Sequence, residues 1–188
     1  MRAFIALEIP GEIRTYLQSI TKSMAIHMDG VKWVNREGQH VTLKFFGEIE
    51  ETKAFKIRET ISHIEKRYAP FVVTLKGIDA FPGKKRARVI VATLEKGVDN
   101  IRGIFNDIED SLSMIGVEKE KRDFTPHVTL GRRKMPMPLL DRDMARLEER
   151  SFVLNNLVLF SSALTREGAI YNPVWEIKLG GEESEGRE

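Results

Sequence analysis

Two identical tetrapeptides hold the residues best suited to chemistry in this sequence. His40-Val41-Thr42-Leu43 and His127-Val128-Thr129-Leu130 place their histidines 87 positions apart (127 − 40), and they contain two of the chain's four histidines. In a β-strand, side chains alternate between the two faces. Each histidine therefore shares a face with the threonine two positions later, while the valine and the leucine point the other way. A single His-x-Thr pattern is weak evidence, but two identical copies need a better explanation.

Two histidines that face each other across a cleft can divide the work of acid–base catalysis. A neutral imidazole takes a proton from water and an imidazolium donates one to a leaving oxygen, and a pKa of about 6.5 suits histidine to both roles. The hydroxyls of Thr42 and Thr129 can donate hydrogen bonds to the non-bridging oxygens of a phosphodiester. The usual two-histidine metal spacing is absent, so the sequence predicts no metal and no cofactor.

Length and composition indicate a soluble globular protein. The 188 residues carry a net charge of +2, contain no cysteine, and are 41% hydrophobic and 31% charged. No apolar run approaches the roughly 18 residues of a membrane span, and the opening segment is too short for a signal peptide. We therefore expect a cytoplasmic protein without a membrane partner. Disulfides, thiolate catalysis and Cys-based zinc sites are excluded, and the acidic segment 181–188 is expected to be a flexible tail.

Periodic apolar residues predict an α+β fold. Apolar positions three and four residues apart indicate helices at 11–28, 54–68, 98–115 and 139–149. Apolar or alternating runs between turn residues indicate strands at 2–9, 31–34, 38–46, 71–75, 87–94, 127–134, 152–160 and 169–179. The Met-Pro-Met-Pro segment at 135–138 is expected to break the second motif strand.

Shifting the chain by the same 87 positions aligns the predicted elements as well as the motifs. The helix at 11–28 falls on 98–115, and the strand at 3–8 falls on 90–95. We therefore predict one domain, 1–188, made of two intertwined lobes related by a pseudo-twofold axis. Each lobe would be a duplicated β-α-β(His-x-Thr)-α-β unit, with antiparallel-rich sheets lining a central cleft and helices outside.

The sequence resembles the two-histidine (2H) phosphoesterases, in particular the RNA 2′,3′-cyclic phosphodiesterases historically called 2′-5′ RNA ligases. The resemblance is carried by residues 40–47 and 124–132, with further similarity at 2–7, 31–34, 161–164 and 168–171. It implies a bilobal fold and metal-independent opening of cyclic phosphates to 2′-phosphates. It also implies that His40 is the proton donor and His127 the proton acceptor, although the identical motifs alone leave that assignment open.

The resemblance further implies that Thr42 and Thr129 bind the phosphate and that Arg132 supplies a cation. Strict alternation along the strand turns Arg132 to the opposite face and favours Lys44 instead. Only a bulge or a strand end after Gly131 would bring the arginine back to the cleft.

Aromatic residues near the first motif are candidates for stacking on a nucleic-acid base. By alternation, Phe46 shares the face of the histidine, whereas Phe45 is expected to pack in the core. Trp33 is a further stacking candidate, and Tyr171 and Arg166 can contribute from the last loop.

Three functions are compatible with these residues. The first is hydrolysis of RNA or nucleoside 2′,3′-cyclic phosphate ends to 2′-phosphates. The second is the reverse step, in which a 2′-5′ RNA ligase joins a 5′-hydroxyl strand to the cyclic end with the same residues. The third is a non-catalytic module that binds RNA ends or nucleotides. The two proton-transfer groups count against this function, because binding alone does not need them. The expected partners are RNA 3′ ends with a 2′,3′-cyclic phosphate, including tRNA fragments. Nucleotides are further expected ligands. The protein is expected to be a monomer.

Overall fold

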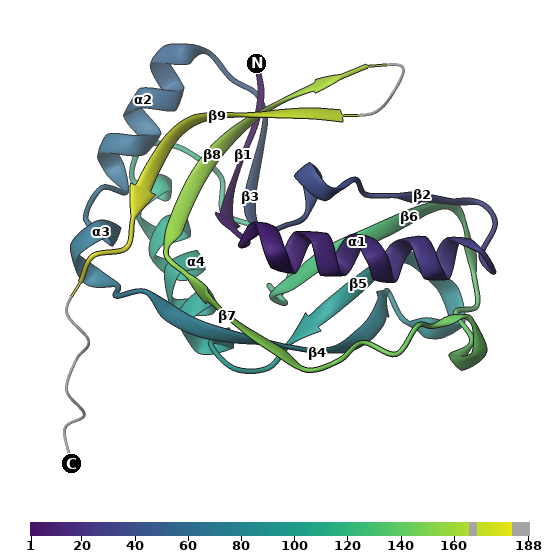
Figure 1. Cartoon of the computed structure of the whole chain (residues 1–188). Helices are drawn as coiled ribbons and strands as arrows, with labels where there is room; N and C mark the ends of the chain where they lie inside the picture. Colours follow the sequence, from purple (N-terminus) through teal and green to yellow (C-terminus); the bar gives the residue numbers. More distant parts are fainter. Residues whose placement is uncertain (166–168, 182–188) are drawn as a thin grey trace.

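Two antiparallel sheets form the framework of the protein (Figure 1). The computed structural model describes residues 1–165 and 169–181. The first sheet has four strands, in the spatial order β3 (His40–Glu48), β1 (Arg2–Glu8), β8 (Asn156–Leu164) and β9 (Ala169–Lys178). The second sheet has five, in the order β2 (Val31–Trp33), β6 (His127–Met137), β5 (Ala87–Leu94), β4 (Phe71–Phe81) and β7 (Arg150–Leu154). The mixed α+β class with antiparallel sheets is thus confirmed.

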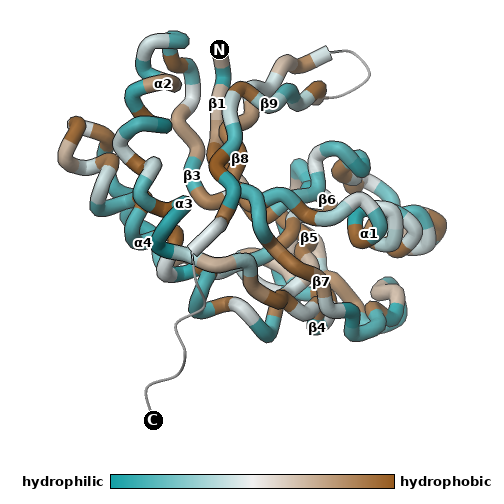
Figure 2. Tube along the Cα trace, turned by 60° about the vertical axis from the view of Figure 1, so that its left-hand side comes forward, coloured by the Kyte–Doolittle hydropathy of each residue, from teal (hydrophilic) through white to brown (hydrophobic). Residues whose placement is uncertain are grey.

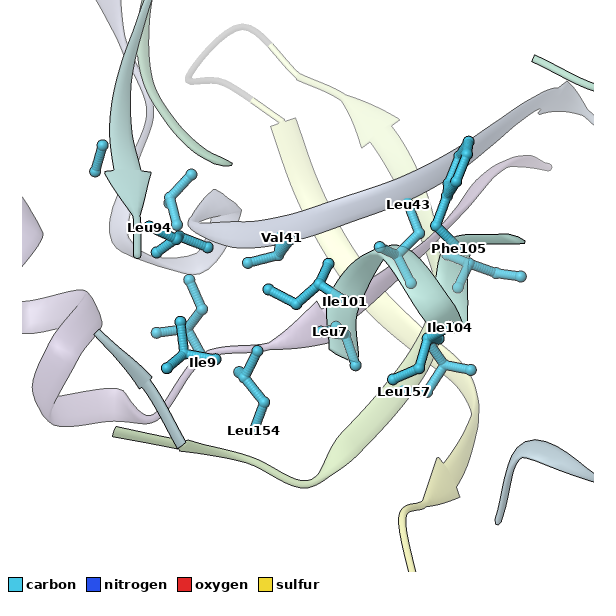
Figure 3. Packing of buried hydrophobic residues seen from close by; sticks show 14 of the residues in the cluster. Leu7, Ile9, Val41, Leu43, Leu94, Ile101, Ile104, Phe105, Leu154 and Leu157 are labelled. Atoms are coloured by element: carbon cyan, nitrogen blue, oxygen red, sulfur yellow. The ribbon is translucent and has the colours of Figure 1, made fainter. Parts of the chain in front are cut away.

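Helices cover one face of each sheet. Helix α1 (Gly11–Ala25) lies against β2 and β6 of the second sheet, and the other helices gather at the first sheet (Figure 1). These are α2 (Glu51–Thr60), α3 (Ile64–Arg67) and α4 (Val98–Ser113), and short 3₁₀ turns occupy η1 (Arg36–Gly38), η2 (Lys84–Arg86) and η3 (Asp141–Asp143). Hydrophobic and hydrophilic residues alternate along α1 and α4, as expected of helices with one buried face (Figure 2). Figure 3 shows Ile101 and Ile104 of α4 packed among Leu7, Val41 and Leu157 of the first sheet.

Each sheet combines strands from both halves of the chain. In the first sheet, the motif strand β3 is followed by β1 and then by β8, which comes from the second half. In the second sheet, the motif strand β6 is followed by β5 and then by β4, which comes from the first half. β3 lies at the edge of its sheet, whereas β6 lies between β2 and β5, and the two motif strands approach each other where the sheets meet.

The helix predicted at 139–149 is wrong, because that segment forms only the turn η3. Its backbone groups make tertiary hydrogen bonds instead. The N–H of Leu139 donates to the carbonyl of Lys84 (2.7 Å), and the N–H of Glu148 donates to the hydroxyl of Tyr16 (2.7 Å). Helix propensity is a weak preference that tertiary contacts of this kind override.

The strand predicted at 152–160 is two strands in different sheets. β7 ends at Leu154 and pairs with β4, whereas β8 begins at Asn156 and pairs with β1. The carbonyl of Asn155, at the crossover, accepts the N–H of Leu179 (2.9 Å). Asn155 and Asn156 interrupt the apolar run at this point, and the prediction of one continuous strand overlooked them.

The end of the chain is partly anchored. Gly181, the first residue of the predicted tail, donates its N–H to the carbonyl of Tyr68 (3.0 Å). The remainder of that tail, 182–188, lies outside the described residues. Within the residues that the structure describes, no helix is both long and apolar enough to cross a membrane.

A buried ion pair joins the first motif strand to α4. Lys44 Nζ lies 2.5 Å from Glu109 Oε1, and both side chains are 7% exposed. Lys44 also donates to the carbonyl of Glu118 (3.0 Å), and Glu109 accepts the N–H of Glu120 (2.6 Å). The two side chains therefore hold the segment that precedes the second motif against the first motif strand.

Breaking this pair should destabilise the protein strongly. The substitution Lys44→Met leaves the carboxylate of Glu109 buried without its partner, which lowers the free energy of unfolding by about 3–5 kcal/mol. The double variant Lys44→Met/Glu109→Leu removes both charges and should regain most of that loss. Urea unfolding of the three proteins measures the difference. Equal destabilisation in the single and double variants would contradict the assigned pairing.

Candidate active site

One unpaired residue within each tetrapeptide decides which of the following side chains reach the space between the sheets. In β3, Thr42 pairs with Ala6 and Lys44 pairs with Ile5, so Leu43 has no partner and forms a β-bulge. Ile5 belongs to the main core. The bulge therefore turns Lys44 toward the core and its ion pair, so Lys44 does not supply the cleft with a free ammonium as alternation had predicted.

The second motif strand has the same irregularity. Thr129 and Gly131 pair with adjacent residues of β5, which leaves Leu130 unpaired. Arg132 pairs with Val89 two places further along β5, so it lies on the same face as Thr129. The bulge that the sequence required after Gly131 thus occurs one residue earlier, and it brings Arg132 to the cleft.

The same bulge in β3 reverses the expected roles of two phenylalanines. Phe45 pairs with Phe4, their ring centroids are 5.5 Å apart, and Phe45 is 62% exposed. Phe46 packs against the main core. The prediction from strict alternation, with Phe46 in the cleft and Phe45 in the core, is therefore wrong. The sequence held a signal for the correct choice. The 87-residue offset between the motifs aligns Phe45 with Arg132 (132 − 87), the residue that the family resemblance assigns to the cleft.

Residues of both motifs line a single cavity of about 490 Å³. Its wall includes Thr42 from β3 together with His127, Thr129 and Arg132 from β6. The strands come from different sheets and approach each other along the cavity. Two hydroxyls, one imidazole and one guanidinium thus converge on one space, which suits a compact anion such as a phosphate group.

The imidazole of His127 is held in one tautomer. Its Nδ1 lies 2.7 Å from the carbonyl oxygen of Thr125. A carbonyl oxygen only accepts, so Nδ1 carries the hydrogen and Nε2 has a free lone pair when the ring is neutral. Burial lowers the pKa of His127, the bond to Thr125 opposes that shift, and the charge of Arg132 lowers the pKa further. Near neutral pH, His127 is therefore suited to accept a proton at Nε2.

The imidazole of His40 lies within an aromatic cluster. It stacks on Phe4 and Phe160, with centroid separations of 5.0 and 5.2 Å, and the ring of Tyr171 meets it edge-on at 5.6 Å. Only 8% of His40 is exposed. Burial lowers its pKa to about 4, and the positive charge of Arg14 adds to the effect. His40 is therefore neutral at pH 7 unless an anion approaches it.

A second cavity, of about 530 Å³, adjoins the first. Phe4 and Tyr171, which contact the ring of His40, line it, and Phe45 and Arg132 line both cavities. Arg132 lowers the pKa of His127 and also that of Tyr171, whose pKa burial raises. The guanidinium is thus close enough to act on His127 and on Tyr171, which contacts the ring of His40.

The other predicted candidates lie as follows. Trp33 is half-buried and lines the second cavity with Tyr171. The chain's other two histidines, His27 and His63, are exposed and line neither cavity. Arg166 lies outside the described residues. Across residues 1–165 and 169–181, no three or more acidic or histidine side chains gather as a metal-binding group would.

Comparison with known proteins by sequence points to one family of phosphoesterases. The model of the LigT-like phosphoesterase family matches residues 7–91 and 93–171. An RNA 2′,3′-cyclic phosphodiesterase of Aeropyrum pernix is 37% identical over 153 residues, which is 79% of this chain and 86% of that protein. A protein of the same name from Aquifex aeolicus is 32% identical over 187 residues, covering 96% of this chain and 98% of the relative.

Solved structures share the fold. A crystal structure of TT0787 from Thermus thermophilus superposes with a TM-score of 0.83 at 25% identity, covering 97% of this chain and all (100%) of that one. E. coli LigT complexed with 3′-AMP superposes with a TM-score of 0.76 at 22% identity, covering 95% of this chain and 97% of the other.

The burial of His40 should make stability depend on pH. Its pKa is about 4 in the folded protein against about 6.5 in an unfolded chain, so the unfolded state binds the proton first as pH falls. The resulting stabilisation is complete above pH 6.5 and is lost between pH 6.5 and 4, amounting to about 3 kcal/mol. The stability advantage of the wild type over His40→Asn should therefore shrink by up to this amount between pH 7 and 4. Urea unfolding at several pH values tests this, and a difference independent of pH would contradict it.

Proposed function

The chain belongs to the LigT-like phosphoesterase family, and on that premise we propose that it is an RNA 2′,3′-cyclic phosphodiesterase. The observation that carries the proposal is the cavity in which Thr42, from one sheet, meets His127, Thr129 and Arg132, from the other. The names of the two relatives described above support the same reaction. In that reaction, water adds to the phosphorus, the bond to the 3′ oxygen breaks, and a 2′-phosphate with a free 3′-hydroxyl remains.

In the proposed mechanism, His127 is the proton acceptor. Its Nδ1–H is held by the Thr125 carbonyl, so Nε2 is available to take a proton from the attacking water. The lowered pKa of His127 keeps the ring neutral, as a base must be before it acts. A hydrogen bond that fixes the ring also removes the need to reorient it during the reaction.

His40 is the proposed proton donor to the leaving 3′ oxygen. With a pKa of about 4, the free ring carries little proton at pH 7. A bound phosphodiester brings a negative charge beside the imidazole, and an adjacent anion raises the pKa of a histidine. The substrate itself therefore promotes protonation of the acid that cleaves it.

The remaining groups are proposed to bind the phosphate. The hydroxyls of Thr42 and Thr129 come from opposite walls, and each can donate one hydrogen bond to a non-bridging oxygen. Arg132, exposed at the junction of the two cavities, adds a positive charge that strengthens its attraction as negative charge builds on those oxygens. No step requires a metal or a cofactor.

We further propose that the physiological substrates are RNA 3′ ends with a 2′,3′-cyclic phosphate, such as tRNA fragments, in the cytoplasm. A monomer suffices, since the cavity is formed within one chain. The reverse joining reaction would use the same groups, with a 5′-hydroxyl in place of water.

The direct test is incubation with nucleoside 2′,3′-cyclic monophosphates and identification of the phosphate isomer. We expect the 2′-phosphate, formed equally well with and without a chelator. His40→Ala and His127→Ala should each lower kcat by about 10²–10⁴, the usual contribution of a general acid or base. The exposed His63 offers the matched control, and His63→Ala should keep wild-type activity. Full turnover by either active-site variant would rule out the two-histidine mechanism.

Phe45 and Phe46 provide a matched pair for the base-binding wall. Phe45→Ala removes an exposed ring beside the cavity, and loss of one base–aromatic stack, worth about 1–3 kcal/mol, should raise KM about 5- to 150-fold. Phe46→Ala removes core packing and should lower the melting temperature with a smaller change in KM. Steady-state kinetics and thermal unfolding of both variants measure this, and the opposite pattern would restore the assignment from simple alternation.

A further inference from the structure

The second cavity is rich in positive charge and aromatic rings. Three cations line it, Arg2, Lys32 and Arg132, and no aspartate or glutamate belongs to its described wall. A third cavity, of about 520 Å³, shares Lys44 and Phe45 with the first and differs from the second in charge, because Glu118 and Glu120 lie among its lysines. The second cavity therefore has the composition of a site for a second anionic group next to a planar ring.

Two glycines give the aromatic wall its shape. A Cβ atom at Gly131 would lie 2.9 Å from Cε3 of Trp33, and one at Gly38 would lie 2.9 Å from Cε2 of Tyr171. Both separations are too short for carbon atoms, so each ring lies directly on backbone that only glycine leaves uncovered. The rings are thus seated by the fold.

The two cations that the proposed mechanism leaves unused converge on this space from different sheets. Lys32 of β2 lies opposite Arg132 in the strand register. Arg2 of β1 and Arg132 both oppose the rise in the pKa of Tyr171 that burial causes, so both charges lie near that hydroxyl. Among the residues that the structure describes, neither Arg2 nor Lys32 is in an ion pair, and both are exposed. Their charges are therefore available to a ligand.

The geometry of the reaction indicates which part of the substrate enters this cavity. In an in-line displacement, the leaving oxygen departs on the side opposite the attacking water. With water at His127 and the 3′ oxygen at His40, the ribose extends toward the His40 side. Phe4 and Tyr171, which contact the ring of His40, line the second cavity. The next charged group in that direction along an RNA strand is the phosphate on the 5′ oxygen of the same ribose.

We propose that the second cavity is a subsite for the 5′-phosphate or phosphodiester of the terminal nucleotide, bound by Arg2 and Lys32. The enzyme then distinguishes an RNA end from a free nucleoside 2′,3′-cyclic phosphate by this second anion. The inference rests on the proposed function, because it takes the cyclic phosphate to lie between the two motifs.

The test compares kcat/KM for adenosine 2′,3′-cyclic phosphate with and without a 5′-phosphate. The wild type should favour the 5′-phosphorylated substrate about tenfold, the size expected for a charged hydrogen bond to an exposed phosphate. In Arg2→Gln/Lys32→Gln, the ratio of the two kcat/KM values should fall to near one. Added salt should lower the wild-type ratio as well, because exposed charges are screened.

The matched control removes two charges from the third cavity. Lys53 and Lys121 line only the third cavity, so Lys53→Gln/Lys121→Gln should keep the wild-type ratio. The inference is overturned by a ratio of one in the wild type or by an unchanged ratio in the Arg2/Lys32 variant. It is equally overturned if the ratio is lost in the Lys53/Lys121 variant, since the strand would then extend toward the third cavity.

A binding measurement separates this inference from the proposed function. Failure to open either cyclic phosphate would defeat the proposed phosphodiesterase activity. Calorimetry with adenosine 2′-phosphate and adenosine 2′,5′-bisphosphate gives the same ratio without turnover, on the same three proteins. Tighter binding of the bisphosphate that disappears only in the Arg2/Lys32 variant supports the subsite, and equal binding of the two ligands by the wild type refutes it.

Discussion

Each His-x-Thr tetrapeptide contains one residue, Leu43 or Leu130, that the neighbouring strand does not match. Without that residue, the pleat of a regular strand would send positions one, three and five of the motif to the cleft. With it, positions one, three and six share a face, which gives His40, Thr42 and Phe45 in one strand and His127, Thr129 and Arg132 in the other. All of these except the buried His40 line the cavity between the motifs. The bulge thus sets the composition of the cleft, with an aromatic ring on one side and a guanidinium on the other.

The bulge in β3 also decides where the charge of Lys44 lies. By facing the core, Lys44 meets Glu109 of α4, and this buried pair binds the segment that leads to the second motif. A lysine is costly to bury unless a carboxylate accompanies it. Within the described part of the chain, Arg132 at the cleft is in no ion pair, so its positive charge remains available to a phosphate.

The two histidines share a sequence environment but not a physical one. His127 lies against Phe81 and is tied to the Thr125 carbonyl, whereas His40 lies among Phe4, Phe160 and Tyr171. Desolvation lowers both pKa values, and His40, the less exposed of the two, falls to about 4. An identical motif therefore supports different proton-transfer roles, because neighbours from other strands set the pKa and the tautomer.

Local periodicity and residue identity were enough to predict the α+β class, the starts of α1 and α4, and the paired His-x-Thr tetrapeptides. They were not enough to predict which of Phe45 and Phe46 faces the cleft, or whether Lys44 or Arg132 does. Those outcomes depend on one unpaired residue in a strand, and a bulge depends on the partner strand rather than on local sequence. The missing helix at 139–149 has the same origin, because hydrogen bonds to distant segments replaced the structure that local propensity favoured.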